Sequence, residues 1–283
     1  MNLENLLDYI QAGILKKETQ KSSIQPNINV DISHQSNVAK LLDEENILNA
    51  LKEYSQLTQK NSMFYKDYIY VSSLTSKCIR QILFEYFNYD KCNVSVYPYL
   101  GLITAVGEFV HQFLQQLLGF DYVEHEIYSE QLKVKGRIDA INILDDNSYN
   151  VIEIKTIKAD ELKSESFTGR IEHIRQLKFY MYLLATEQQK PVKYGQLLYI
   201  SRNLDAIKVF TFEYNPNDSD VEYCINKANE IQKAIATKQI PNLDHPFIEK
   251  TKCYFCPYKE ICLLKKEEFS SDLLYSEQDF VIL

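Results

Sequence analysis

Basic residues are too few in this chain to make its surface positive. Lys and Arg number 31 against 39 Asp and Glu, which gives a formal net charge of −8 over 283 residues. A nucleic-acid partner would therefore have to be held by a local basic patch, by aromatic stacking or by metal ions. Hydrophobic residues make up 45% of the chain, which excludes a disordered protein.

Long hydrophobic runs are also lacking. The apolar stretches are short and interrupted by charge, so none is expected to span a bilayer. The first residues, MNLENLLDYIQ, lack the basic stretch followed by an apolar stretch that marks a secretory signal. We therefore expect a cytoplasmic protein with no membrane partner.

The spacing of apolar residues divides the chain into an amino-terminal extension and one larger domain. Residues 3–17 have helical spacing and residues 18–37 are polar, which predicts an amphipathic helix followed by a linker. This helix could dock a partner or pack on its own domain. We expect residues 1–50 to form the extension and residues 51–283 to form the domain.

Helical and strand-like patterns alternate in groups along the domain. Helices are predicted for residues 38–59, 72–87, 103–118, 171–185 and 218–237. Strands are predicted for residues 122–132, 134–144, 149–157, 194–201 and 207–214. The order of helices, strands, helix, strands and helix predicts a mixed α/β (α+β) fold, with a central mixed β-sheet flanked by helices.

Two of these strands carry charged residues that could do chemistry. Asp139 lies near the end of one strand, in GRIDA, and Glu153 and Lys155 lie two apart in VIEIKT on the next. Side chains alternate along a strand, so Glu153 and Lys155 share a face while Ile152 and Ile154 point into the core. Two such carboxylates suit Mg²⁺ or Mn²⁺, and Lys155 could orient a water or stabilise developing negative charge on a phosphate. The same residues could instead form an ordinary cross-strand salt bridge.

Three residues on predicted helices bear on this choice. His111 lies in GEFVHQFL, although a single His on an amphipathic helix is more often structural than a ligand. Gln176 and Tyr180 lie four apart in QLKFY, so they project together from the helix that follows Lys155. Their order and spacing relative to the two carboxylates are uncommon.

In this order of residues the chain resembles the PD-(D/E)XK nuclease superfamily, specifically its RecB-like branch. The family pattern is a helical His, a G-x-I/V-D strand, an E-x-K strand and a Q-x-x-x-Y helix. The matching positions here are His111, residues 136–139, residues 153–155, Gln176 and Tyr180. The resemblance implies a restriction-endonuclease-like core that hydrolyses phosphodiester bonds.

The resemblance also implies a role for each matching residue. The ligands of Mg²⁺ or Mn²⁺ would be His111, Asp139, Glu153 and the carbonyl group of Ile154. Lys155 would be the catalytic lysine. Two further residues would contact substrate or brace the site, and these are Gln176 and Tyr180.

Four of the six cysteines form a lopsided set. Cys78 stands alone, and Cys253, Cys256 and Cys262 form a C-x2-C-x5-C motif. Clustered cysteines in a reducing compartment indicate a metal or cluster site rather than disulfides. A four-cysteine zinc site usually has two C-x2-C motifs, so this spacing favours a [4Fe-4S] cluster, and a zinc site is the alternative. The two remaining cysteines, which we expect to be buried or idle thiols, are Cys92 and Cys224.

The same arrangement of cysteines occurs in a subset of RecB-like nucleases, which includes the CRISPR-associated Cas-four exonucleases and AddB-type helicase-nuclease subunits. Arg80 matches that subset, while Ile79 stands where its members usually have Pro. The resemblance implies an iron-sulfur cluster that joins the two ends of the nuclease domain. We expect a structural role, because a link from Cys78 to Cys253 closes a long loop.

The residues and the resemblance together predict a metal-dependent DNA exonuclease that acts on single strands or duplex ends. Its setting would be CRISPR adaptation, an antiviral defence, or DNA repair and recombination, with partner proteins of an adaptation or helicase complex. The alternative is a non-catalytic or weakly catalytic nucleic-acid-binding subunit. A basic stretch could meet DNA phosphates or form a solvated mixed face, and its members are Lys155, Lys158, Lys163, Arg170, Arg175 and Lys178.

Overall fold

The structure is a computed structural model that describes residues 67–89, 100–248, 253, 256–264 and 281–282. All of these residues belong to the second of two compact units, Lys52–Leu283. The helix and linker predicted within residues 1–50, the helix predicted for residues 38–59, and Cys92 lie outside the described residues.

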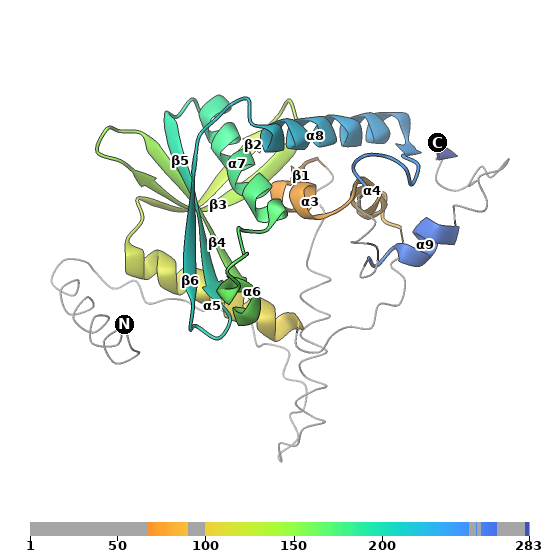
Figure 1. Cartoon of the computed structure of the whole chain (residues 1–283). Coiled ribbons are helices and arrows are strands. Elements are labelled where there is room, and N and C mark those ends of the chain that lie inside the picture. The colour runs from red at the N-terminus through yellow and green to blue at the C-terminus, as the bar shows by residue number, and fades with distance from the viewer. Residues whose placement is uncertain (1–66, 90–99, 249–252, 254–255, 265–280, 283) are drawn as a thin grey trace, which may run out of the picture. The chain divides into compact units, whose positions relative to one another are not determined.

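The predicted order of helices and strands is confirmed over residues 100–237 (Figure 1). The helices are α3 (Val71–Ser76), α4 (Ile79–Tyr86), α5 (Leu100–Leu118), α6 (Ala159–Lys163), α7 (Ile171–Thr186), α8 (Ser219–Thr237) and α9 (Lys259–Leu264). The strands are β1 (Ile69–Tyr70), β2 (Tyr122–Ser129), β3 (Val134–Ile143), β4 (Tyr149–Ile157), β5 (Val192–Ser201), β6 (Ile207–Glu213), β7 (Gln239–Ile240) and β8 (Val281–Ile282). Of the helices in the described ranges, none is long and apolar enough to cross a membrane.

A six-stranded mixed sheet lies at the centre of the domain. β2 pairs antiparallel with β3 along one edge, from residue 134 to residue 141. On the other edge of β3, β1 pairs parallel at residues 134–135 and β4 pairs antiparallel at residues 140–143. β5 then runs parallel to β4, and β6 runs antiparallel to β5. β3 therefore changes partner along this edge. Between the two ladders, at residues 136–139, β3 pairs with neither β1 nor β4.

Helices cover both faces of this sheet. On one face the main core packs against α3, α4, α7 and α8, with residues such as Val151, Leu177 and Ile231 fully buried. On the other face a smaller core, Ala140, Ile152 and Ile154, packs against Leu114 of α5 and its neighbours. The expected fold class, a mixed α/β fold with a central mixed sheet flanked by helices, is confirmed (Figure 1).

The single helix predicted for residues 72–87 is wrong, because the chain forms two helices there. Lys77 and Cys78 have extended backbones, with φ of −104° and −72°. Cys78 begins the second helix, and its Sγ accepts a hydrogen bond from the Gln81 N–H at 3.4 Å. Leu74 and Ile79 on either side of the break both pack in the main core, so the apolar spacing continues although the helix does not.

Other differences from the sequence prediction are local. β1, β7 and β8 span only two residues each and α6 only five, which is too short to leave a periodic pattern. The strand predicted for residues 122–132 ends at Ser129. Asp139 lies in the middle of β3 rather than near its end, as the sequence suggested, although the ladder with β4 stops beside it.

Gly136 of β3 is required by the close approach of a helix. A Cβ atom at this position would lie 2.5 Å from Cε1 and 2.7 Å from the hydroxyl oxygen of Tyr180, which projects from α7. The Tyr180 hydroxyl in turn accepts a hydrogen bond from the Arg137 N–H at 3.3 Å. The glycine of the G-x-I-D motif therefore lets an aromatic ring lie directly against the strand.

Replacing Gly136 with Ala should destabilise the protein by about 1–3 kcal/mol, because Tyr180 is buried and has little room to move. Urea denaturation measures this change as a lower free energy of unfolding. Gly107→Ala is the control, because its new Cβ meets only Thr156 Oγ1, at 3.3 Å, and its effect should stay within about 1 kcal/mol. A Gly136→Ala protein as stable as the wild type would show that the ring does not constrain this strand.

Candidate active site where strands β3 and β4 separate

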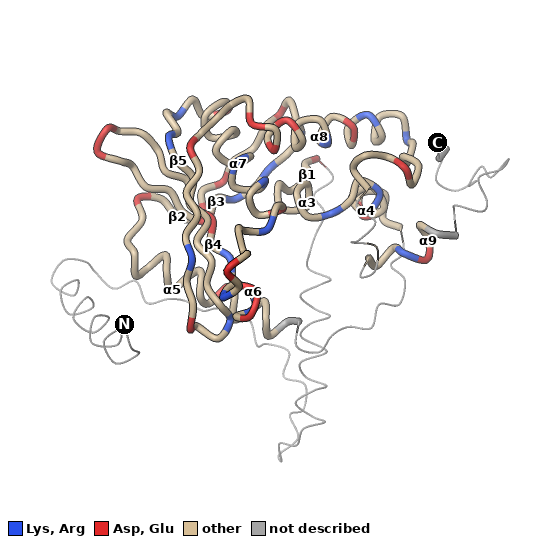
Figure 2. The backbone as a smooth tube through the Cα atoms, viewed as in Figure 1, with Lys and Arg blue, Asp and Glu red and all other residues tan. Residues whose placement is uncertain are grey.

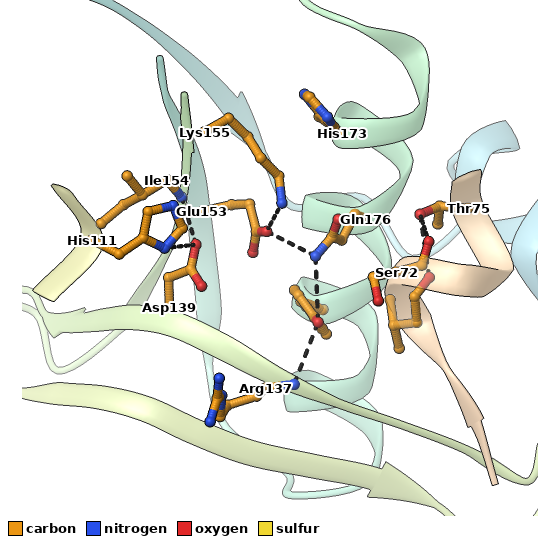
Figure 3. Close-up of polar contacts among 12 residues, drawn as sticks. Ser72, Thr75, His111, Arg137, Asp139, Glu153, Ile154, Lys155, His173 and Gln176 are labelled. Carbon is orange, nitrogen blue, oxygen red and sulfur yellow. Dashed lines mark hydrogen bonds and ion pairs between the residues drawn. The ribbon is translucent and has the colours of Figure 1, made fainter. Parts of the chain in front are cut away.

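The candidate site lies where β3 and β4 part. Their ladder ends with the pair Ala140 and Ile152, so Asp139 and Glu153 would form the next pair. Instead, the Asp139 Oδ2 accepts a hydrogen bond from the Ile154 N–H at 2.7 Å (Figure 3). A side chain thus replaces a backbone partner, and the gap between the strands is filled by polar groups.

The alternation of β3 also changes at this point. Ile138 and Ile141 both pack in the main core although they are three residues apart, and Ala140 between them packs on the opposite face. Across the β2 ladder, Glu124 lies opposite Asp139, has a left-handed backbone with φ of 52°, and makes no ladder pair. Both ladders of β3 are therefore irregular beside Asp139.

From the α7 face, one carboxylate oxygen of Glu153 collects two donors. The Gln176 Nε2 donates to Glu153 Oε1 at 2.7 Å, and the Lys155 Nζ lies 2.5 Å from the same oxygen (Figure 3). Gln176 and Tyr180 project together from α7 and lie 3.5 Å apart, as their spacing predicts. Glu153 contacts Lys155, while Ile152 packs in the smaller core, so the prediction that Glu153 and Lys155 share a face opposite Ile152 is confirmed.

From the α5 face, His111 and Gln115 approach Asp139. The His111 Nδ1 lies 3.7 Å from the Asp139 Oδ2. One turn further along α5, the Gln115 Nε2 donates to the Asp139 carbonyl oxygen at 2.9 Å and to Glu124 Oε1 at 2.6 Å. The structure therefore brings His111, Asp139, Glu153, Lys155, Gln176 and Tyr180 together at one place.

Sequence reasoning missed several residues beside the site. Gln115 lies four residues after His111, which is a signal of a shared helical face, but Glu124 had no recognisable pattern. Tyr199 lies directly across from Lys155 on β5, and its hydroxyl accepts from the Arg170 N–H and lies 3.1 Å from His173 Nδ1. Burial lowers the pKa of His173 to about 3, so this imidazole stays neutral.

Burial makes the two carboxylates of the site difficult to ionise together. It raises the pKa of Glu153 to about 8, and the charge of Asp139 adds to the rise. Burial also raises the pKa of Asp139, although His111 and Lys155 oppose this. For Lys155, burial acts to lower the pKa, but the two carboxylates outweigh it and hold the pKa above its ordinary value. Lys155 therefore stays protonated, and the site is short of positive charge.

One buried oxygen in the site lacks a partner. Glu153 Oε2 is enclosed and finds no hydrogen-bond donor within the described part of the chain. An unpaired buried carboxylate oxygen is costly unless a cation or a hydrogen-bond donor contacts it. The carboxylate oxygens of the site therefore suit a hard divalent cation. The side chains are not gathered as ligands, since no group of three or more His, Cys, Asp or Glu in the described ranges is arranged to hold a metal ion.

Most of the basic residues proposed to meet DNA phosphates are occupied by acids. Arg170 bonds Glu161 and Lys163 pairs with Asp205. Arg175 and Lys178 both pair with Asp220 at the start of α8. Blue and red segments accordingly alternate along the backbone in Figure 2. A solvated mixed face is therefore a better interpretation of this stretch than a DNA-binding patch, because most of its basic side chains form ion pairs within the protein.

The thiols of the four cysteines in the lopsided set influence one another electrostatically, but no three of these described cysteines are gathered so that they could hold a metal ion. Burial raises the pKa of Cys78, and the charges of Cys262 and Cys253 add to the rise. Burial likewise raises the pKa of Cys256 to about 11, with further contributions from the other three thiols. These thiols are free rather than disulfide-bonded. Cys224 is fully buried elsewhere in the main core, which confirms that it is a buried thiol.

Comparison with known proteins decides the family. A model of the PD-(D/E)XK nuclease superfamily matches residues 99–263, which is more than half of the chain and includes the whole α5-to-α7 site. The chain belongs to the PD-(D/E)XK nuclease superfamily. No curated protein matches it.

Solved structures similar to this chain include SSO0001 and a phage-related exonuclease. The crystal structure of SSO0001 is similar over 76% of this chain and 96% of that chain, with a TM-score of 0.52 and 23% identity. A phage-related exonuclease from Haemophilus somnus is similar over 60% of this chain and 96% of that chain, with a TM-score of 0.40 and 11% identity. The first likeness supports the fold alone.

Magnesium should stabilise the protein more at about pH 9 than at about pH 6, because protons compete with the ion for buried carboxylates. In the metal-free protein, the raised pKa of Glu153 contributes stability that is fully present below pH 4.5. This contribution is lost as the pH rises through about 8. The measurement is the rise in melting temperature when Mg²⁺ is added to chelator-treated protein at each pH.

Glu153→Gln should weaken that dependence on pH, since an amide does not titrate in this range. Glu213→Gln, a change of an exposed carboxylate on β6, is the control and should behave like the wild type. Equal increments in melting temperature at both pH values for the wild type would contradict competition between protons and the ion for the buried carboxylates.

Proposed function

We propose that this protein is a metal-dependent deoxyribonuclease, an exonuclease that hydrolyses phosphodiester bonds in single-stranded DNA or at duplex ends. The observation that supports it most is the buried, unpartnered Oε2 of Glu153 beside Asp139 and a protonated Lys155. Superfamily membership, which is shown, supplies the nuclease class. The substrate and the mode of cutting are the proposal.

In this proposal the separated strands hold one Mg²⁺ or Mn²⁺. The ligands are His111, Asp139, Glu153 and the Ile154 carbonyl oxygen. When bound, the ion polarises the scissile phosphate and makes the attacking water more acidic. Two of the proposed ligands are already held by hydrogen bonds, Asp139 by the Ile154 N–H and Glu153 by Gln176.

The remaining site residues act on substrate or brace the site. Lys155 is placed to orient a water or to stabilise the negative charge that develops on the phosphate, and it keeps its proton over the physiological range. Gln176 positions Glu153 through the hydrogen bond at 2.7 Å. Tyr180 braces β3 through the Arg137 N–H, and burial raises its pKa, so its hydroxyl keeps its proton.

We further propose that residues 51–283 form a RecB-like nuclease domain of the iron-sulfur branch. The four cysteines would hold a [4Fe-4S] cluster, which joins the segment before α4 to the segment around α9. The electrostatic influence of these thiols on one another, from distant parts of the chain, supports this. CRISPR adaptation or DNA repair, in the cytoplasm and with partner proteins, would be the setting.

Purified protein should degrade labelled DNA in the presence of Mn²⁺ or Mg²⁺, and EDTA should abolish the reaction. Asp139→Asn and Lys155→Met should each lower the rate on the order of 10²-fold or more, because each removes charge that acts in the transition state. The measurement is the release of labelled nucleotides from single-stranded and duplex substrates, with circular dichroism to confirm folding.

Lys193→Met is the matched control, since Lys193 is exposed and forms its ion pair with Asp146, outside the candidate site. It should retain the wild-type rate. Wild-type protein that binds DNA and cuts neither substrate with either ion would overturn the proposal, and would favour the alternative of a non-catalytic nucleic-acid-binding subunit.

A further inference from the structure

Arg80 of α4 is a buried cation without an anion. Its side chain is 2% exposed, and no ion pair among the described residues includes it. The Nη1 donates to the Pro241 carbonyl oxygen at 2.6 Å, and the Nε donates to the Cys262 Sγ at 3.1 Å. The guanidinium carbon lies 5.5 Å from the centre of the Phe84 ring. All of these neighbours are neutral if Cys262 is a thiol, and a buried charge without compensation is costly.

The third nitrogen of Arg80, Nη2, indicates the direction in which an anion could bind. Nη2 is buried and has no hydrogen-bond partner in the described ranges. Nη2 and Nε share one edge of the planar guanidinium, the edge that binds oxyanions through two parallel hydrogen bonds. Because Nε on this edge faces the Cys262 sulfur, the free Nη2–H group is directed to the same side.

The sulfur that Nε meets belongs to the set of four cysteines. Cys262 acts electrostatically on Cys78, whose Sγ already accepts the Gln81 N–H at the start of α4. A helix amino terminus and a guanidinium both favour negative charge on sulfur. Another buried cation, Lys227, donates to the carbonyl oxygens of Leu74 and Lys77 just before Cys78. The Gln81 N–H and Lys227 thus both act to lower the pKa of Cys78, although burial outweighs them in the metal-free chain.

We propose that Arg80 is the charge partner of the cysteine-bound centre, with its Nε and Nη2 donating to sulfur atoms of that centre. This inference rests on the proposed function of the cysteines. Four thiolates with a [4Fe-4S]²⁺ core or a Zn²⁺ ion carry a net charge of about −2, which a buried guanidinium partly offsets. Arg80 is thus a positioning residue that stabilises the centre and not the fold of the metal-free chain.

The test compares Arg80→Met with the wild type, each purified without oxygen and studied with and without its metal. Arg80→Met should release iron to a chelator at least about tenfold faster, because a charge-assisted hydrogen bond is lost. It should lower the melting temperature of the loaded protein. In the metal-free protein it should leave the melting temperature unchanged or raise it, since an unpaired buried charge has been removed.

Arg202→Met is the matched control, because Arg202 also has a buried Nε without a partner but acts on Glu161, in α6. It should release iron at the wild-type rate. Equal loss of stability in loaded and metal-free Arg80→Met protein, or an unchanged release rate, would overturn the role of Arg80. Wild-type protein with neither iron and sulfide nor zinc would overturn the cysteine-bound centre itself. Zinc without iron would overturn the cluster assignment, and the same comparison would then be decided with zinc release.

Discussion

The structure depends on one interruption of the central sheet. β3 pairs with β4 only as far as Ala140, and further along the same edge it pairs with β1 at residues 134–135. The backbone groups freed by this change of partner need other hydrogen bonds, and Asp139 supplies one to the Ile154 N–H. The same interruption opens the sheet so that His111 from α5 and Gln176 from α7 reach one place. The change of strand partner therefore gathers polar groups where β3 and β4 separate.

Electrostatics then gives that place its chemistry. Two carboxylates share a buried position with one ammonium group, and burial raises the pKa of both acids. Few arrangements relieve such a site, and a divalent cation is the one that also suits phosphodiester hydrolysis. The cysteine region shows the complementary case, a buried guanidinium that lacks an anion. In both regions the uncompensated charge of the protein indicates the charge of a proposed ligand, which is positive beside the carboxylates and negative beside Arg80.

The sequence predicted the regular elements well and their interruptions poorly. Residues 100–237 carry clear periods of burial, so their main helices and strands could be predicted within a few residues, as could the shared face of Glu153 and Lys155. The helix break at Cys78 was missed because Leu74 and Ile79 keep the apolar spacing across it. The irregularity at Asp139 depends on Glu124 across the ladder and on β1, and such long-range partners leave no local signal. The contact of Arg80 with Cys262 could not be predicted either, because the two residues are far apart in the sequence.

In the proposed function, the gap between β3 and β4 is a binding site for a divalent cation. Anomalous diffraction from crystals soaked in Mn²⁺ tests it most directly. We predict a peak about 2 Å from carboxylate oxygens of both Asp139 and Glu153, with the Ile154 carbonyl oxygen within the same coordination shell. Manganese bound only elsewhere, with Glu153 still held by Lys155 and Gln176 alone, would contradict the account.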